Sequence, residues 1–361
     1  MEGCKINSPL VSIIIPVFNR KDLVKEMIDS IINQTYSNWE LLLIDDGSES
    51  DTLDLLSKYV EIDKRIHLYR RERIPKGAPT CRNIGLINSK GNYIVFLDSD
   101  DLLPSITLQQ RVDFMMANNN IDFGIFPAIS FNKKIGEYDA WCRGIKIGNN
   151  DLPLLIDSYL PFLVVTNIYK KESLINKNIY WDEKLASLQD ADFNIQNILK
   201  GNKYQYAQDA FIDYYIRIIP QSNSISQNIY KSSHVNSHLY FIKKIYNSLN
   251  KKQVNKYRWA IRRRIIYIYS LLGFNNIPGR DNLKKIIHKY DNKFYYLFIC
   301  SINIYNFLRT ISCPKSNILA FPYFYIYMYF ENIFINRKTK NIIKNKIQNN
   351  INNKLQIHKS F

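Results

Sequence analysis

Cysteine is scarce in this sequence. Its five cysteines are widely separated, and no two of them form a C-x-x-C pair or join histidines at metal-ligand spacing. This pattern excludes a disulfide framework and a cysteine-based zinc site, and it fits thiols that stay reduced in a cytoplasmic protein. The first residues carry no basic stretch followed by an apolar run, so we expect no secretory signal.

Long apolar runs are also lacking. The two most apolar and aromatic stretches, residues 294–308 and 318–330, are shorter than the roughly 20 residues that a helix needs to cross a bilayer. Pro322 also interrupts the second stretch. We therefore predict that neither is a transmembrane helix.

Acidic residues are almost absent from the last third of the chain. Residues 221–361 contain 24 Lys and Arg but only 3 Asp and Glu. Residues 1–220 contain 25 Lys and Arg and 29 Asp and Glu. The formal net charge of +17 therefore arises entirely in the C-terminal part. A basic region of this kind can bind nucleic acid through phosphate contacts. No nucleic-acid-binding motif is visible, however, and the first half of the chain is acidic, so we expect that nucleic acid is not a partner. The rival to an enzymatic function is a non-catalytic protein that binds nucleic acid or a membrane through this basic region.

The first half of the chain alternates between short apolar runs and segments with helical spacing. Runs at residues 11–16, 39–44 and 93–97 predict buried strands, and residues 20–34 carry apolar side chains on one helical face. These lengths suit parallel pairing through a crossover helix. We therefore predict an α/β fold with an open, mostly parallel sheet flanked by helices. Further helices are predicted at residues 52–59, 80–88 and 191–199, and further strands at 66–69, on the sheet edge, and at 211–216.

Polar residues follow three of the predicted strands, at residues 16–20, 45–48 and 98–101. The carboxyl ends of parallel strands meet at one edge of a sheet, where ligands bind. We therefore expect the three clusters to converge there.

The third cluster contains Asp98, Asp100 and Asp101. Carboxylates this close raise one another's pKa, and a divalent cation relieves the repulsion; hard oxygen ligands suit Mn²⁺ or Mg²⁺. The alternative is a helix N-cap ahead of a helix after Pro104, although a cap needs only one carboxylate.

The other two groups are less specific by themselves. Asp45 and Asp46 carry carboxylates that can accept hydrogen bonds from a nucleobase or a ribose, but the same residues are common in ordinary turns. Arg82 lies on a predicted helix after a loop that contains glycine and proline, where it either binds a nucleotide or is simply solvated.

Taken together, these segments resemble a known family. Residues 11–20 (VSIIIPVFNR), 30–48 (SIINQTYSNWELLLIDDGS) and 81–101 (CRNIGLINSKGNYIVFLDSDD) resemble the N-terminal half of a family 2 glycosyltransferase with the GT-A fold, of the bacterial capsule and O-antigen type. The resemblance extends over about residues 9–220 and implies a metal held by a D-x-D motif, here Asp98-Ser99-Asp100 with Asp101 after it. The residues that it implies for binding the nucleotide of a sugar donor, UDP by preference, are Pro16, Phe18, Asn19, Arg20, Asp45, Asp46, Arg82, Asp98, Ser99 and Arg217.

A second match lies further along, at residues 181–185 (WDEKL) and 188–193 (LQDADF). It resembles the acceptor-side motif of the family, whose D-x-D-F aspartate serves as general base, and this residue is Asp190 here. Gln189 replaces the usual glutamate. Judged without the resemblance, Asp190 is better explained as the cap of the helix that follows.

The end of the matched region resembles the segment that closes the family's catalytic domain, where Arg217 would lie beside the diphosphate. The histidine often found there is missing, so a third metal ligand from this loop is in doubt. His234 or His238 could replace it, or both could be ordinary histidines.

These expectations describe an inverting, metal-dependent glycosyltransferase that transfers a sugar from a nucleotide donor to a hydroxyl of a glycan or lipid-linked acceptor. A catalytic domain is predicted over residues 1–228 and a basic, aromatic-rich helical region over residues 229–361, with no fixed fold expected from about residue 340. The basic region either contacts anionic lipid at the inner face of the cell membrane or forms a helical cap or homo-oligomer surface. A nucleotidyltransferase would carry a glycine-rich loop after the first strand, which this sequence lacks.

Overall fold

The computed structural model describes residues 8–132, 138–146, 148–218, 232–274 and 279–300. The chain forms two compact units, one made of residues 1–155 and 160–222, the other of residues 156–159 and 223–361. The predicted domain boundary at residue 228 and the predicted unstructured tail both lie outside the described residues.

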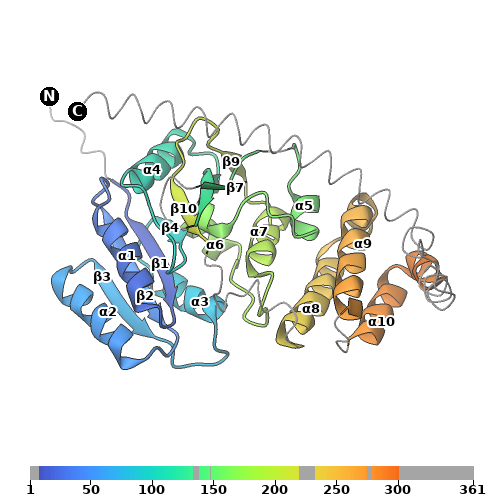
Figure 1. Cartoon of the computed structure of the whole chain (residues 1–361). Helices are drawn as coiled ribbons and strands as arrows, with labels where there is room; N and C mark the ends of the chain where they lie inside the picture. The colour runs from blue at the N-terminus through green and yellow to red at the C-terminus, as the bar shows by residue number, and fades with distance from the viewer. Residues whose placement is uncertain (1–7, 133–137, 147, 219–231, 275–278, 301–361) are drawn as a thin grey trace. The chain divides into compact units, whose positions relative to one another are not determined.

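The first unit is built on a seven-stranded sheet (Figure 1). Six of its strands are parallel to one another, and only β8 runs against both of its neighbours. The predicted open, mostly parallel sheet is therefore confirmed, with β3 at its edge. Across the sheet the order is β3 (Ile66–Arg70), β2 (Trp39–Asp45), β1 (Val11–Val17), β4 (Tyr93–Phe96), β8 (Asn167–Lys170), β5 (Phe123–Ile125) and β9 (Tyr204–Tyr206).

Helices connect these strands (Figure 1). The helices predicted from the sequence are present, and their ends differ from the predicted ends by at most three residues. The helices are α1 (Lys21–Ile32), α2 (Ser50–Ile62), α3 (Ala78–Asn88), α4 (Thr107–Ala117), α5 (Leu152–Ile156), α6 (Lys171–Asn176) and α7 (Gln189–Leu199), together with a 3₁₀ turn, η1 (Val164–Thr166).

Burial explains why these segments form. All seven residues of β2 are buried, as expected for a strand with both sheet faces covered. Helix α1 turns Val24, Met27, Ile28 and Ile31 inward, at the spacing of one helical face. Helix α3 lies so close to β1 that a Cβ atom on Gly85 would come within 2.3 Å of the Cγ2 atom of Ile14.

A small second sheet completes this unit. Strand β10 (Tyr214–Arg217) pairs in parallel with β6 (Ala128–Phe131), which pairs with β7 (Tyr138–Arg143) in the opposite direction. The strand predicted over residues 211–216 thus begins later, at Tyr214. Leu102 pairs with Tyr215, so the chain that follows the aspartate cluster is fixed to β10.

The described residues of the second unit form the helices α8 (Ser232–Ser248), α9 (Lys251–Phe274) and α10 (Arg280–Tyr290), and residues 292–300 are helical as well. The predicted helical C-terminal region is therefore confirmed as far as residue 300. No helix in the described part of the chain combines the length and the apolar character that crossing a bilayer requires. The apolar core of this unit includes Phe241, Ile242, Ile261, Ile265, Leu283 and Ile287.

Candidate functional site

The turn after β1 is fixed to the turn after β2. Asn19 and Arg20 both adopt left-handed backbone conformations, with φ of 56° and 62°. The backbone N–H of Asn19 donates to Ser48 Oγ at 2.8 Å, and the N–H of Glu49 donates to Asn19 Oδ1 at 2.9 Å. Two of the three predicted clusters therefore share one hydrogen-bonded corner at the carboxyl ends of neighbouring strands.

Phe18 lies at this corner and is 45% exposed. The ammonium group of Lys76 lies 3.6 Å from the centre of its ring. Pro16, at the end of β1, is only partly buried. An exposed aromatic ring beside a lysine offers a stacking surface for a planar, negatively charged ligand.

The two acids after β2 have different surroundings. Asp45 is fully buried, and its carboxylate accepts hydrogen bonds from the N–H groups of Gly47, at 3.1 Å, and Ser48, at 2.9 Å. These contacts make Asp45 a turn-forming residue, as in the ordinary-turn alternative. Asp46 instead accepts hydrogen bonds from Arg71 Nε and from the N–H of Gly77, at 3.3 Å, and thereby ties the loop after β3 to the strand ends.

The aspartates after β4 each have a separate partner. Asp98 accepts a 2.6 Å hydrogen bond from Arg82 Nη2, and its side chain is 42% exposed. Asp100 forms an ion pair with Arg20. Asp101 is buried and accepts hydrogen bonds at 2.8 Å from the Tyr214 hydroxyl and from the backbone N–H of residue 217.

The three carboxylates are not gathered around one point as the sequence predicted. No group of three or more His, Cys, Asp or Glu side chains in the described residues is arranged to hold a metal ion. The physical reason is that Asp101 is turned inward onto β10, where both of its oxygens accept hydrogen bonds. Ser99, between the acids, is buried as well.

The electrostatics nevertheless favour a cation at this cluster. Burial, followed by the neighbouring Asp98, raises the pKa of Asp100, and the charge of Arg20 opposes the rise. Burial and the charge of Asp100 raise the pKa of Asp101 well above its ordinary value. A divalent cation would stabilise the ionised carboxylates, and Asp98 and Asp100 provide the hard oxygen ligands that Mn²⁺ or Mg²⁺ prefers.

Arg82 is at the centre of the candidate site. Although it lies on α3, it is only 6% exposed, so the solvated alternative is wrong. Its guanidinium stacks 4.3 Å from the centre of the Trp181 ring. Besides the bond to Asp98, Arg82 Nη1 lies 3.5 Å from Gln189 Oε1. Among the described residues, nothing accepts a hydrogen bond from its Nε atom.

Asp190 lies beside this arginine, in the first turn of α7. The backbone N–H of Val164 donates to its Oδ2 atom at 3.3 Å. Burial raises the pKa of Asp190, the positive charge of Arg82 lowers it, and the negative charge of Asp98 raises it. Helix α7 begins after Leu188 without a side-chain cap, so the alternative of Asp190 as the helix cap is wrong. The structure therefore brings Asp98, Arg82 and Asp190 together from three separate segments.

The segment before α7 is anchored by residues for which the sequence suggested no role. Asn83 Oδ1 accepts the N–H of Trp181 and Asn83 Nδ2 donates to its carbonyl, both at 2.9 Å. Arg73 forms two hydrogen bonds of 2.6 Å to the carboxylate of Glu183. The hydrogen bonds from Arg73, followed by its charge, also lower the pKa of Glu183. Asn83 and Arg73 thus fix the Trp181 ring against which Arg82 stacks.

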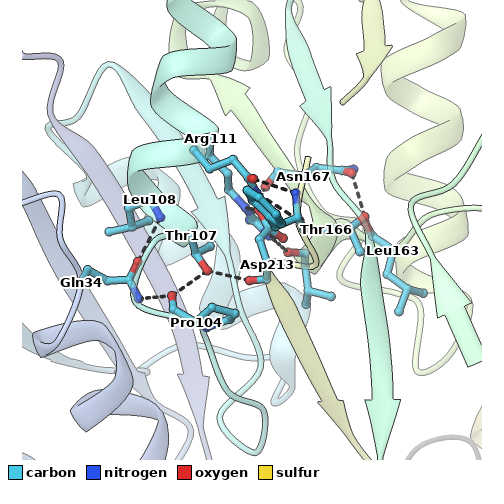
Figure 2. Close-up of polar contacts among 12 residues, drawn as sticks. Gln34, Pro104, Thr107, Leu108, Arg111, Leu163, Thr166, Asn167 and Asp213 are labelled. Atoms are coloured by element: carbon cyan, nitrogen blue, oxygen red, sulfur yellow. Dashed lines mark hydrogen bonds and ion pairs between the residues drawn. The ribbon is translucent and has the colours of Figure 1, made fainter. Parts of the chain in front are cut away.

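A fully buried ion pair supports both halves of the site (Figure 2). Arg111 Nε and Nη2 donate to the two carboxylate oxygens of Asp213 at 2.8 and 3.0 Å, and neither side chain is exposed to solvent. The same guanidinium donates to the carbonyls of Val165, at 3.1 Å, and Asn167, at 3.2 Å. Asp213 precedes Tyr214, the partner of Asp101. Val165 follows Val164, whose backbone N–H donates to Asp190.

The remaining predicted residues are less central. Arg217 donates from Nη2 to Glu26 at 2.5 Å and from Nε to the carbonyl of Asp100 at 2.8 Å, so its guanidinium is already engaged. His234 and His238 are buried in α8, in the second unit. His238 Nδ1 lies 2.6 Å from Arg264, and burial together with that positive charge lowers its pKa to about 3. Within the described residues, neither histidine belongs to a group of metal ligands.

The sequence of the first unit agrees with one protein family. Residues 12–168 match the family described as Glycosyl transferase family 2. This segment is a family 2 glycosyl transferase domain. It contains β1, β2 and β4 with the polar residues at their carboxyl ends, whereas Asp190 lies beyond the matched range.

Among curated proteins, the Escherichia coli UDP-Glc:alpha-D-GlcNAc-diphosphoundecaprenol beta-1,3-glucosyltransferase WfgD is 37% identical over 132 residues. The match covers 36% of this chain and 51% of that protein. In general the chain spans about half the length, or less, of the first curated relatives it matches.

Solved structures share the fold of this chain. Staphylococcus aureus TarS, residues 1–349 in complex with UDP-GlcNAc, superimposes with a TM-score of 0.59 at 18% identity, covering 94% of this chain and 92% of that one. The mannosyltransferase PcManGT from Pyrobaculum calidifontis, in complex with GDP-Man and Mn²⁺, gives a TM-score of 0.53 at 13% identity, covering 96% and 88%. These likenesses confirm the predicted GT-A fold.

Proposed function

We propose that this chain is an inverting, metal-dependent glycosyltransferase of cell-surface polysaccharide synthesis. It would transfer a sugar from a nucleotide donor to a hydroxyl of a glycan or lipid-linked acceptor. The observation that carries the proposal is the arrangement around Arg82, which has Asp98 at one side and Gln189 and Asp190 at the other. The family 2 domain and the nucleotide-sugar complexes of the structural neighbours support it.

The donor would bind at the hydrogen-bonded corner of β1 and β2. Phe18 offers an exposed ring for the nucleobase, and Asp46 offers carboxylate oxygens to its N–H groups. UDP is our preferred nucleotide, because the TarS complex contains UDP-GlcNAc and WfgD is named for UDP-Glc. The GDP-Man complex of PcManGT makes GDP the alternative to test.

Asp98 and Asp100 would hold the divalent cation, which when bound neutralises the charge that develops on the departing diphosphate. The protein's own arginines lie beside the same carboxylates. Arg20 pairs with Asp100 and Arg82 with Asp98, so each guanidinium is placed to bind a phosphate oxygen when its carboxylate takes another partner.

Asp190 is proposed to remove the proton from the acceptor hydroxyl. Its Oδ2 atom is held by the N–H of Val164, which leaves Oδ1 to accept the proton. The raised pKa of Asp190 makes it a stronger base than an ordinary aspartate. The acceptor oxygen forms its bond to the anomeric carbon while the bond to the diphosphate breaks on the opposite face, so a single displacement inverts the configuration.

The test is a hydrolysis and transfer assay of the full chain with UDP- and GDP-sugars in Mn²⁺. The Asp190→Asn variant removes the base while keeping the size of the side chain. We expect it to bind the donor like the wild type and to transfer sugar about 10²–10⁴-fold more slowly. Unchanged transfer by Asp190→Asn would show that Asp190 is not the base.

The second unit is proposed to contact an anionic membrane at its cytoplasmic face. Its described residues from 232 to 300 include 14 Lys and Arg but 2 Asp and Glu. One of those two acids, Asp291, already forms an ion pair with Arg262. Exposed apolar side chains accompany the charge, notably Trp259, Tyr296 and Leu297. Basic and aromatic side chains together bind anionic headgroups. The alternative is that this unit forms a homo-oligomer surface. Only a membrane contact predicts that the chain sediments with anionic vesicles.

A further inference from the structure

The loop between β3 and α3 contacts the corner where the nucleobase of the donor is proposed to bind. Near the end of this loop, the ammonium group of Lys76 lies over the ring of Phe18, and the backbone N–H of Gly77 donates to Asp46 at 3.3 Å. At its start, Arg71 donates from Nε to the same carboxylate. A base that stacks on Phe18 with its polar edge toward Asp46 therefore faces this loop.

Backbone hydrogen bonds hold Arg71 and Asp46 side by side. The N–H of Arg71 donates to the carbonyl of Asp45 at 2.9 Å, which continues the pairing of β2 with β3 past the strand ends. The N–H of Asp46 donates to the carbonyl of Val17, the last residue of β1, at 2.8 Å. The side chains of Arg71 and Asp46 are only 13% and 9% exposed. Their ion pair is therefore a fixed part of the sheet edge and differs from an exposed surface pair, which contributes little.

The carboxylate of Asp46 has little capacity left to accept hydrogen bonds. A carboxylate has two oxygens with about four lone-pair sites. Arg71 Nε and the N–H of Gly77 both donate to Oδ1. Burial, then the charge of Asp46 and a hydrogen bond to it, raise the pKa of the Cys81 thiol to about 12, so the thiol stays protonated and is a third donor. Because Oδ1 already has two donors, Oδ2 is left with room for a single N–H of a ligand.

The guanidinium of Arg71 offers further donors beside that oxygen. A guanidinium carries five N–H groups in a fixed plane. The bond from Nε to Asp46 uses one of them, and Nη1 donates to the carbonyl of Arg73 at 2.5 Å. The N–H groups that remain can donate to a carbonyl of a ligand. Asp46 and Arg71 together therefore present one acceptor next to a donor.

This arrangement matches the edge of uracil and opposes that of guanine. Uracil has one N–H between two carbonyl oxygens, so the N–H can donate to Asp46 Oδ2 while a carbonyl accepts from Arg71. Guanine has two adjacent N–H groups, which bind a carboxylate as a pair when both of its oxygens are open. On Asp46, where Arg71 occupies Oδ1, one of these N–H groups would lose its water without gaining an acceptor, which is costly.

We propose that Arg71 determines the choice of nucleobase, because it occupies one oxygen of Asp46 and thereby selects uracil and rejects guanine. The inference rests on the proposed function, since it concerns the nucleotide of a sugar donor. It gives a reason within this chain for the preference of UDP over GDP. The role of Arg71 is to set specificity, and the reacting atoms do not involve it.

The test measures the binding of UDP, GDP and inosine diphosphate (IDP) to the full chain by titration calorimetry in Mn²⁺. IDP differs from GDP only in lacking the amino group of the base, so it isolates the second N–H of guanine. For the wild type we expect UDP to bind at least about tenfold more tightly than GDP, and GDP to have no advantage over IDP. A lower Kd for GDP than for UDP, or a Kd for GDP about tenfold below that for IDP, would overturn the proposal without any variant.

Arg71→Met removes the guanidinium and opens Asp46 Oδ1. We expect the Kd for UDP to rise about tenfold, and GDP to bind about tenfold more tightly than IDP, because the amino group now finds an acceptor. A purely structural loss would weaken all three nucleotides alike and change no ratio between them. The matched control is Arg70→Met, because the side chain of Arg70 is 63% exposed and pairs with Asp45 instead. In this control both Kd ratios should stay within about twofold of the wild type.

The outcomes separate this inference from the proposed function. If the wild type binds none of the three nucleotides and hydrolyses no sugar nucleotide, the proposed function is wrong and the inference falls with it. If the wild type binds UDP and Arg71→Met keeps both the UDP-to-GDP and the GDP-to-IDP ratio, only the role of Arg71 is wrong. The same holds if Arg70→Met changes these ratios as much as Arg71→Met does, because the effect would then come from any positive charge at this end of β3.

Discussion

Replacing Arg111 by methionine tests whether the buried ion pair holds the first unit together. Methionine keeps most of the side-chain volume but removes the charge and all four hydrogen bonds of the guanidinium. Asp213 would remain fully buried without a positive partner, and such a loss costs about 3–5 kcal/mol. This is a large part of the about 5–15 kcal/mol that stabilises a typical domain.

The destabilisation should depend on pH. Burial raises the pKa of Asp213, and the charge of Arg111 opposes that rise. Without Arg111 the pKa of the folded state rises further, so the folded variant keeps a proton that the unfolded chain releases. Stability is then greatest below the unfolded pKa, near 3.9, and falls as the pH increases through the window up to the folded pKa. We therefore expect Arg111→Met to lose more stability, relative to the wild type, at pH 8 than at pH 5.

Urea unfolding followed by circular dichroism measures the effect. With an m-value of about 2–3 kcal/mol per molar, a loss of 3–5 kcal/mol lowers the midpoint by about 1–2.5 M. The control is Lys25→Met, which breaks the exposed Lys25–Asp29 pair and should leave the midpoint unchanged. Adding Asp213→Asn to Arg111→Met should recover part of the loss, because a neutral amide is less costly to bury. A midpoint for Arg111→Met as high as that of the control would refute the reasoning.

The other predictions concern activity and location. Arg82→Met removes a positive charge beside Asp190 and should raise the pKa of Asp190, so the acidic limb of the pH–rate profile should move to higher pH. An unmoved limb would contradict the interaction between Arg82 and Asp190. In the wild type, chelator should abolish sugar transfer and Mn²⁺ should restore it, whereas Asp98→Asn should stay inactive at every Mn²⁺ concentration. Full activity in chelator would contradict the proposed dependence on a divalent metal. The chain should sediment with anionic vesicles at low salt but not at high salt or after truncation near residue 228, whereas sedimentation independent of salt would argue against an electrostatic contact.

Residues at the strand ends could be predicted from the sequence because their placement follows from local pattern and topology. An apolar run that ends in Asp98 or Asp45 locates the residue at the carboxyl edge once the sheet is known to be parallel. The direction of each side chain could not be predicted in this way. Asp45 turns back onto its own loop, and Asp101 turns onto β10, because their hydrogen-bond donors are contributed by the folded chain.

Long-range partners had no local signature. Arg111 and Asp213 are 102 residues apart, and neither belongs to a motif, so nothing in the sequence around them indicates that they pair. Arg73 and Glu183 are 110 residues apart and were missed for the same reason. The role of Asp190 was suggested only by resemblance to a family. The contact with Val164 supplies the geometry that local sequence lacked.

The tight approach of α3 to β1 has a consequence for natural variation. Any side chain at position 85 would meet Ile14 about 1 Å too close, and the helix would have to retreat from the strand. Arg82 lies one turn earlier on that helix and would retreat with it, away from Asp98. Errors of this size in aligned reacting groups can slow an enzyme about a hundredfold. A methyl group added at position 85 would therefore disturb the candidate site while every carboxylate in it stays intact.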